Sequence, residues 1–271
     1  MPNNGPAWSL LNPKLKRSVC VFFDVLGFRQ TTEDAIYKGN PDKFLGRFQR
    51  VLVREIIAFR RKFKALDWKY RVFTDNIVLA APVFDDGEDE FGMLHDALCR
   101  CQLEMAAEGF FVRGGVSVGG LHMDEYVIWG PALLEAYDLE SKHALFPRIV
   151  LSEDMVAMVR KHIGYYDDPS TAPQNSALLM DPDGKSFLNY LDAALIDAPA
   201  TRHWHLVISH KAKIEAALNK HRGNPRIWDK YYWCATYHNY FCGLVSNEPG
   251  YTNNFLVSNK IASRGPDRFV K

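Results

Sequence analysis

The chain has 271 residues, of which 47% are hydrophobic and 24% are charged, and its formal net charge is +1. This composition is typical of a globular protein, and the small net charge argues against a nucleic-acid coat or a polybasic membrane anchor. No apolar run approaches the roughly 20 residues of a membrane helix, and residues 1–17 lack the apolar stretch of a secretory signal, so we expect a cytoplasmic protein.

The chain begins with a pattern for a buried strand and a long helix. Residues 18–23 (SVCVFF) are apolar and β-prone, and the run ends at Asp24, as is typical of a central strand. Residues 26–28 predict a turn that leads into a helical region. Apolar residues then recur at helical spacing over 43–64, with Arg and Lys between them.

A hairpin and a second helix follow. Residues 69–73 and 77–81 are two strand-like runs, and the turn-forming residues 74–76 between them predict a hairpin. Residues 85–90 are expected to form an acidic loop, and residues 94–107 a second long helix.

The second half of the chain predicts further strands and then a helical end. The predicted strands are 110–118, 126–129, 147–151, 177–180 and 185–190. The predicted helices are 131–143, one capped by Ser152, 205–222 and 225–243. The stretch from about residue 248 is expected to be irregular.

This order of elements favours an α/β (α+β) fold, in which a mixed sheet carries packed helices and a C-terminal helical extension follows. We expect an N-terminal segment over 1–17, a catalytic domain over 18–195 and the extension over 196–271.

Two carboxylates are candidates for the chemistry. Asp24 ends a buried strand, where ligands of α/β sheets bind, and Gly27 lets backbone N–H groups approach phosphate oxygens. Asp75 is expected at the tip of the hairpin. Carboxylates from adjacent strands can hold two Mg²⁺ or Mn²⁺ ions, one to activate an attacking hydroxyl and one to neutralise a triphosphate.

Over residues 18–190 the sequence resembles the catalytic domain of class III nucleotidyl cyclases. The matching stretches are Asp24-Val25-Leu26-Gly27-Phe28, Thr74-Asp75, Arg113-Gly114-Gly115-Val116, Trp129-Gly130, Leu139-Glu140 and Arg148-Ile149-Val150-Leu151-Ser152. Within the family it looks most similar to the pyrimidine cyclases of bacterial anti-phage defence (the Pycsar system), because of Phe22 to Phe28, Asp75-Asn76, Ala136-Tyr137 with Leu139-Glu140, and Pro147-Arg148-Ile149.

The resemblance implies a role for each matching position. Asp24 and Asp75 would bind two metal ions, Mn²⁺ or Mg²⁺, with the backbone carbonyl of Val25 as a further ligand. The backbone N–H groups of Gly27, Phe28 and Arg29 would hold the β- and γ-phosphates. Phe23 would lie at the pocket edge, although it also fits a core aromatic residue.

Arg71, four residues before Asp75, stands where the family reads the base. Arginine has only hydrogen-bond donors and suits the O2 and O4 carbonyls of uracil, so UTP is the preferred substrate and CTP the next. The alternative is a solvated strand residue.

The sequence departs from the family on the helix after Gly130. The family has Asn and Arg where this chain has Leu134 and Asp138. Residues that could supply the missing positive charge or reach the ribose are Arg113, Lys142, His143 and Arg148 for the charge, and Glu135 and Tyr137 for the ribose or a dimer contact.

The expected function is therefore formation of 3′,5′-cyclic UMP by a homodimer, with the product detected by a separate cyclic-nucleotide-binding effector. The alternatives are a cytidylate cyclase, a non-catalytic nucleotide-binding homologue and a diguanylate cyclase relative. The last is disfavoured because no Gly-Gly-Asp/Glu-Glu-Phe stretch occurs at the hairpin. No binding to nucleic acid or membrane is expected.

Overall fold

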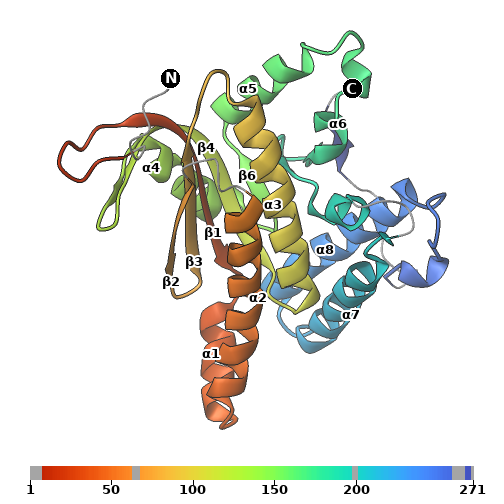
Figure 1. Cartoon of the computed structure of the whole chain (residues 1–271). Coiled ribbons are helices and arrows are strands. Elements are labelled where there is room, and N and C mark those ends of the chain that lie inside the picture. The colour runs from red at the N-terminus through yellow and green to blue at the C-terminus, as the bar shows by residue number, and fades with distance from the viewer. Residues whose placement is uncertain (1–7, 63–67, 197–200, 258–265, 270–271) are drawn as a thin grey trace.

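The computed structural model describes residues 8–62, 68–196, 201–257 and 266–269 (Figure 1). Its strands are β1 (Lys16–Val25), β2 (Lys69–Phe73), β3 (Asn76–Pro82), β4 (Val112–Met123), β5 (Ile128–Trp129), β6 (Ile149–Leu151), β7 (Leu178–Met180), β8 (Ser186–Leu188) and β9 (Asp267–Arg268). Its α-helices are α1 (Phe28–Tyr37), α2 (Pro41–Lys62), α3 (Glu88–Ala107), α4 (Pro131–Asp138), α5 (Glu153–Ile163), α6 (Gln174–Ala177), α7 (Trp204–Lys220) and α8 (Pro225–Leu244).

The described strands form one mixed sheet in the order β2-β3-β1-β4-β6-β8-β7-β9, and β5 pairs with β4 outside this order. β1 is central and antiparallel to both β3 and β4, whereas β4 and β6 are parallel. The C-terminal end of β1 and the β2–β3 turn therefore lie at the same edge of the sheet, as Figure 1 shows.

Helices cover the two faces of the sheet unequally. The larger core joins α2, α3 and the C-terminal helices to one face, and a smaller cluster joins α4 and Trp8 to the other. Helix α4 lies against β4 because Gly115 has no side chain: a Cβ atom there would lie 2.4 Å from the carbonyl oxygen of Ala136. After Asp138 the helix continues as a π-helical segment, Leu139–His143.

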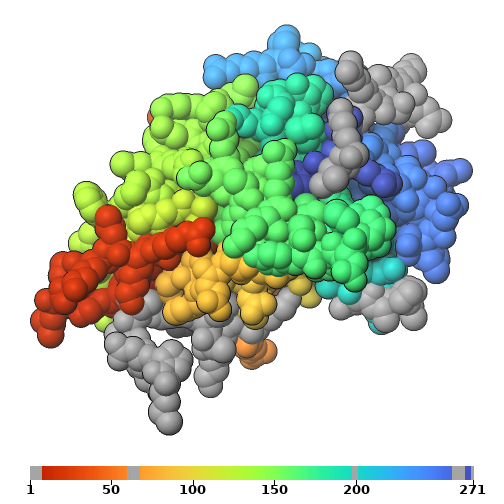
Figure 2. Space-filling model, turned by 90° about the horizontal axis from the view of Figure 1, so that it is seen from above, coloured from red at the N-terminus to blue at the C-terminus, as the bar shows by residue number. Residues whose placement is uncertain are grey.

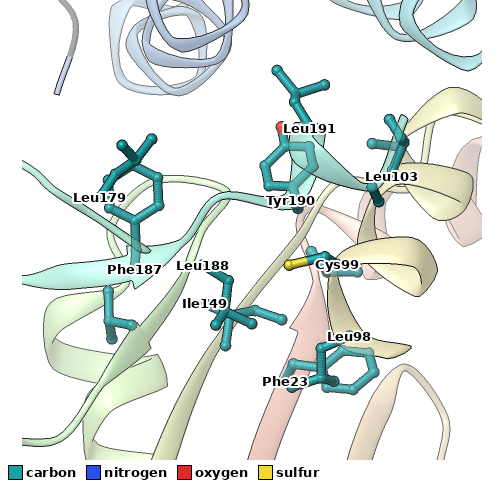
Figure 3. Packing of buried hydrophobic residues seen from close by; sticks show 14 of the residues in the cluster. Phe23, Leu98, Cys99, Leu103, Ile149, Leu179, Phe187, Leu188, Tyr190 and Leu191 are labelled. Carbon is teal, nitrogen blue, oxygen red and sulfur yellow. The ribbon is translucent and has the colours of Figure 1, made fainter. Parts of the chain in front are cut away.

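The C-terminal helices share the main core with the sheet. Trp233, Tyr237 and Phe241 of α8 are buried in the same cluster as Phe23 and Val116. Figure 3 shows this core where β8, α3 and the chain at Leu191 meet. In the space-filling view, the C-terminal segments lie on the side of the molecule away from the N-terminal segment (Figure 2).

A buried chain of hydrogen bonds links Tyr190, which follows β8, to the C-terminal helices. The Tyr190 hydroxyl lies 2.9 Å from Nε2 of His210, whose Nδ1 lies 2.9 Å from Nδ1 of His238. Nε2 of His238 lies 2.9 Å from the carbonyl oxygen of Phe255. All four groups are satisfied when both imidazoles are neutral and each donates one N–H onward.

Arg148 forms a second buried connection. Its side chain has no exposed surface and pairs with Asp181 and Asp183 in the β7–β8 turn. Its guanidinium also lies within 6.0 Å of the ring centres of Phe146, Phe187 and Trp233. Arg148 therefore joins the start of β6 to α8, and it is not available as the missing cation of an active site.

The expected fold class, a mixed sheet with packed helices and a helical C-terminal part, is confirmed. The strand over 18–23, the helix that follows residue 28, the hairpin and the Ser152 cap are also confirmed, since the Ser152 hydroxyl accepts the Met155 N–H. Within the described residues, no helix combines the length and hydropathy that crossing a membrane requires.

Several boundaries predicted from the sequence were wrong. The acidic loop ends before residue 88, because residues 88–90 form the first turn of α3. Carboxylates there interact favourably with the positive end of the helix dipole. β4 starts at 112 and continues through Gly119 and Gly120 to 123. The expected strand over 126–129 is only Ile128–Trp129, and the tail contains β9, which pairs with β7.

Candidate active site

Asp24 lies at the carboxyl end of β1, directly opposite Arg113 in the β1–β4 register. Nε of Arg113 donates to Oδ1 of Asp24 at 3.0 Å, and Nη2 donates to Oδ2 at 3.1 Å. Both side chains are partly accessible, with exposed fractions of 19% for Asp24 and 23% for Arg113. The resulting fork is the strong bidentate arrangement of an arginine and a carboxylate.

Glu140 is the second acidic partner of this arginine. Its Oε1 atom lies 2.6 Å from Nη2 of Arg113, and its side chain is 5% exposed. Burial, and after it the nearby negative charge of Asp24, raises the pKa of Glu140 to about 7. Asp24, Arg113 and Glu140 therefore form one electrostatic group.

Asp75 faces the same group from the neighbouring hairpin. It stands two residues before Ile77, the β3 partner of Phe23, and so lies beside the end of β1. The charge of Asp75 raises the pKa of both Arg113 and Glu140. The structure thus brings Asp24 and Asp75 to one edge of the sheet, as expected from the sequence.

Strained backbone supports the Asp75 turn. Thr74 and Asp75 alone connect β2 to β3, and Thr74 has a positive φ of 56°. This conformation is unfavourable for a β-branched residue. The Thr74 hydroxyl donates to Oδ1 of Asp75 at 2.9 Å, which fixes the carboxylate relative to the turn.

The loop after Asp24 ends in a helix N-terminus. The Leu26 N–H donates to the Phe111 carbonyl at 2.7 Å, and Gly27 then adopts a left-handed conformation with φ 68°. Helix α1 begins at Phe28, and its first turn contains no acidic residue. The first N–H groups of a helix have no intrahelical partner and attract anions, so this loop suits phosphate oxygens.

The other predicted site residues take different positions. Phe23 is 2% exposed and packs in the core near Leu98 (Figure 3), so its ring is a core aromatic and does not line a pocket edge. Val25 is also buried, at 3%. The Phe28 ring contacts Phe48 at 4.9 Å between centres, and the Arg29 side chain pairs with Glu33 in solvent, which leaves their backbone groups for a ligand.

Arg71 lies on β2 and already binds carbonyl oxygens. Its Nη1 atom donates to the Tyr70 carbonyl at 2.9 Å, and Nη2 donates to the carbonyl of Asp124 in the β4–β5 connection. Two of the donors of Arg71 are therefore engaged with backbone carbonyls of the chain itself.

The residues that could supply the missing positive charge lie in different surroundings. Arg113 lies in the site, whereas Lys142 pairs with Asp138 at 2.8 Å in solvent and Arg148 is buried with its own carboxylates. His143 is exposed. At the two positions where the family pattern departs, Leu134 is 68% exposed and Asp138 pairs with Lys142.

Carboxylate oxygens are the hard ligands that divalent cations prefer, and Asp24 and Asp75 offer them at this edge. The pKa of Glu140 is raised mainly by its burial and next by the charge of Asp24. Among the described residues, no group of three or more His, Cys, Asp or Glu side chains is found that could hold a metal ion. Asp24 instead has Arg113 as its counter-ion.

Comparisons with known proteins give weak similarities. No protein-family model and no curated protein matches the chain. It is similar to a solved bacterial light-regulated adenylyl cyclase, with a TM-score of 0.41 and 15% identity over 75% of this chain and 58% of that one. It is also similar to a class III adenylyl cyclase-like ATP-binding protein from Pseudomonas aeruginosa, with a TM-score of 0.38 and 16% identity over 78% and 44%.

The chain thus spans about half the length of these two proteins. Similarities at this level carry no argument about activity, so the function depends on the residues of this chain.

Proposed function

We propose that this chain is a nucleotidyl cyclase that converts a nucleoside triphosphate to a 3′,5′-cyclic mononucleotide and pyrophosphate. The observation that carries the proposal is the meeting of Asp24 and Asp75 at one sheet edge, beside the Gly27 loop. In the reaction, the ribose 3′-oxygen forms a bond to the α-phosphorus. The bond from that phosphorus to the β-phosphate oxygen breaks, pyrophosphate leaves and the hydroxyl proton passes to water.

Asp24 and Asp75 would hold Mn²⁺ or Mg²⁺, two ions per site, with the Val25 carbonyl as a further ligand. When bound, such ions make the attacking hydroxyl more acidic and neutralise charge on the triphosphate. The N–H groups of Gly27, Phe28 and Arg29 would orient the β- and γ-phosphates at the start of α1.

Arg113 would hold the carboxylates in place. It bridges Asp24 and Glu140 at 3.0 and 2.6 Å, so it keeps two mutually repelling acids beside each other. Glu140 then acts as a positioning residue, because its contact with Arg113 restricts the rotation of the guanidinium.

Uracil is the proposed base, with cytosine the second choice. Arg71 presents only donors, and it already binds two backbone carbonyls. The uracil O2 and O4 atoms are carbonyl acceptors of the same kind, so UTP could replace the Asp124 carbonyl as a partner of Arg71.

A homodimer would complete the site. Large apolar side chains are exposed around α4, β5 and the hairpin, on the side of the sheet that α4 covers: Phe73 at 78%, Tyr126 at 76%, Trp129 at 64%, Leu134 at 68% and Tyr137 at 50%. Exposed apolar groups of this number favour a protein partner, and a second copy of the chain is the proposed one. Production of a cyclic pyrimidine nucleotide for a separate effector in anti-phage defence is the biological role we propose.

A four-nucleotide competition tests the proposal. ATP, GTP, CTP and UTP are incubated together with the purified chain and Mn²⁺, and products are identified by mass. We expect one cyclic pyrimidine nucleotide, cyclic UMP, which is lost in Asp75→Ala and retained in the exposed control Asp138→Ala. A folded dimer that yields no cyclic product would refute catalysis and support a nucleotide-binding role. A cyclic purine product would refute the role of Arg71.

A further inference from the structure

Helix α8, which lies outside the part of the chain that resembles a cyclase, reaches the candidate active site. The Tyr231 ring packs edge-on against Phe111, with 5.3 Å between the ring centres. Phe111 is the residue whose carbonyl accepts the Leu26 N–H at 2.7 Å, so the start of α8 lies against the support of the Gly27 loop.

Lys230 is the neighbour of Tyr231 in α8, in the turn of the helix that lies against Phe111. Its side chain is half-buried, and within the described part of the chain it has no hydrogen bond or ion pair. Burial is the main cause that lowers the pKa of Lys230, followed by the positive charges of Arg113 and Arg226, while Asp24 and Glu140 act in the opposite direction. Because Tyr231 packs on Phe111, two residues before the Arg113 that pairs with Asp24, Lys230 is near this charged group in the fold.

Three of the cations that were candidates for the missing positive charge already have acidic partners. Arg113 donates from Nε and Nη2 to Asp24 and lies 2.6 Å from Glu140. Lys142 is held by Asp138, and Arg148 by Asp181. A half-buried ammonium group without a partner is unfavourable unless an anion binds it, so Lys230 is available to a ligand.

Resting on the proposed function, we propose that Lys230 contacts the polyphosphate of the nucleoside triphosphate bound at the Asp24–Asp75 edge. A lysine ammonium is a compact point charge that suits a phosphate group. Arg226 lies one helical turn earlier, on the same side of α8, and is exposed, so it adds positive charge beside Lys230. The C-terminal extension would thereby supply a cation that α4, with Asp138, does not.

Titration calorimetry with inorganic tripolyphosphate and Mn²⁺ tests this contact without requiring turnover. We expect Lys230→Ala to weaken tripolyphosphate binding by about 10- to 100-fold, as loss of one charge-assisted hydrogen bond implies. Lys230→Arg should stay within about threefold of wild type because it keeps the charge. The matched control is Lys213→Ala, a half-buried lysine of α7 with no hydrogen bond or ion pair among the described residues.

The outcomes separate this contact from the cyclase activity. Equal affinity of Lys230→Ala and wild type, or an equal loss in Lys213→Ala, would overturn the assignment of Lys230 even if cyclic nucleotide is formed. A Lys230-dependent affinity in a protein that cyclises no nucleotide would uphold the phosphate contact and overturn only the proposed function. Thermal unfolding of each variant, together with the Lys230→Arg result, distinguishes lost binding from lost folding.

Discussion

Replacing Arg148 by Met removes a fully buried positive charge while keeping much of the side-chain volume. Asp181, which is 9% exposed, would retain only the Trp233 indole N–H at 2.8 Å, whereas Asp183 is 46% exposed and could return to water. Breaking a buried ion pair by removing one partner costs about 3–5 kcal/mol. We expect a loss of that size in the free energy of unfolding, measured by urea denaturation with circular dichroism.

Two further variants test whether the orphaned Asp181 charge causes the loss of stability. Adding Asp181→Asn to Arg148→Met removes the orphaned charge and should recover about 1–2 kcal/mol, because an amide oxygen can still accept the Trp233 N–H. The control Lys142→Met breaks an exposed ion pair and should cost less than about 0.5 kcal/mol. The assignment of Arg148 as structural would be refuted by a cost below about 1 kcal/mol together with loss of nucleotide turnover.

Three further predictions follow from the scaffold. Burial lowers the pKa of His238 to about 4 and also lowers that of His210, so their stabilisation is complete above about pH 6.5 and falls toward pH 4. Urea midpoints should show a loss between pH 7 and pH 5, of which His238 alone contributes about 2 kcal/mol, and the loss should be smaller in His238→Gln. Gly115→Ala should cost about 3 kcal/mol or abolish folding, since its Cβ would meet the Ala136 carbonyl at 2.4 Å. Gly27→Ala, whose Cβ would meet nothing within 4 Å, should cost only about 1 kcal/mol of backbone strain and leave a folded protein for binding assays.

Much of the fold could be predicted because local patterns and tertiary structure agree. The apolar run before Asp24 is central in the sheet, and the helical period predicted over 43–64 corresponds to α2, with residues 63 and 64 outside the described part of the chain. Errors occurred where long-range packing decides the structure. The strand predicted over 110–118 stops before Gly119 and Gly120, but β4 continues because pairing with Lys16 to Ser18 of β1 extends it. The pairing of β9 with β7 joins distant segments, which no local pattern indicates.

The site was predicted only in part, for a related reason. Asp24 and Asp75 follow from strand ends and turn chemistry, which are local signals. The partnership of Arg113 with Asp24 depends on the β1–β4 register, and the burial of Glu140 depends on the π-helical segment after α4. Lys230 had no signal at all, because it is a lysine in an amphipathic-looking helix whose position on the sheet edge is set by tertiary packing.

The central claim is that the carboxylates at the Asp24–Asp75 edge carry the chemistry. The most direct measurement is the rate of Mn²⁺-dependent pyrophosphate release from UTP by Asp75→Asn, with the cyclic product identified by mass and Asp138→Asn as the matched control. The account predicts a loss of at least about 100-fold in Asp75→Asn and an almost unchanged rate in Asp138→Asn, with both proteins folded. Equal rates in Asp75→Asn and wild type would contradict it.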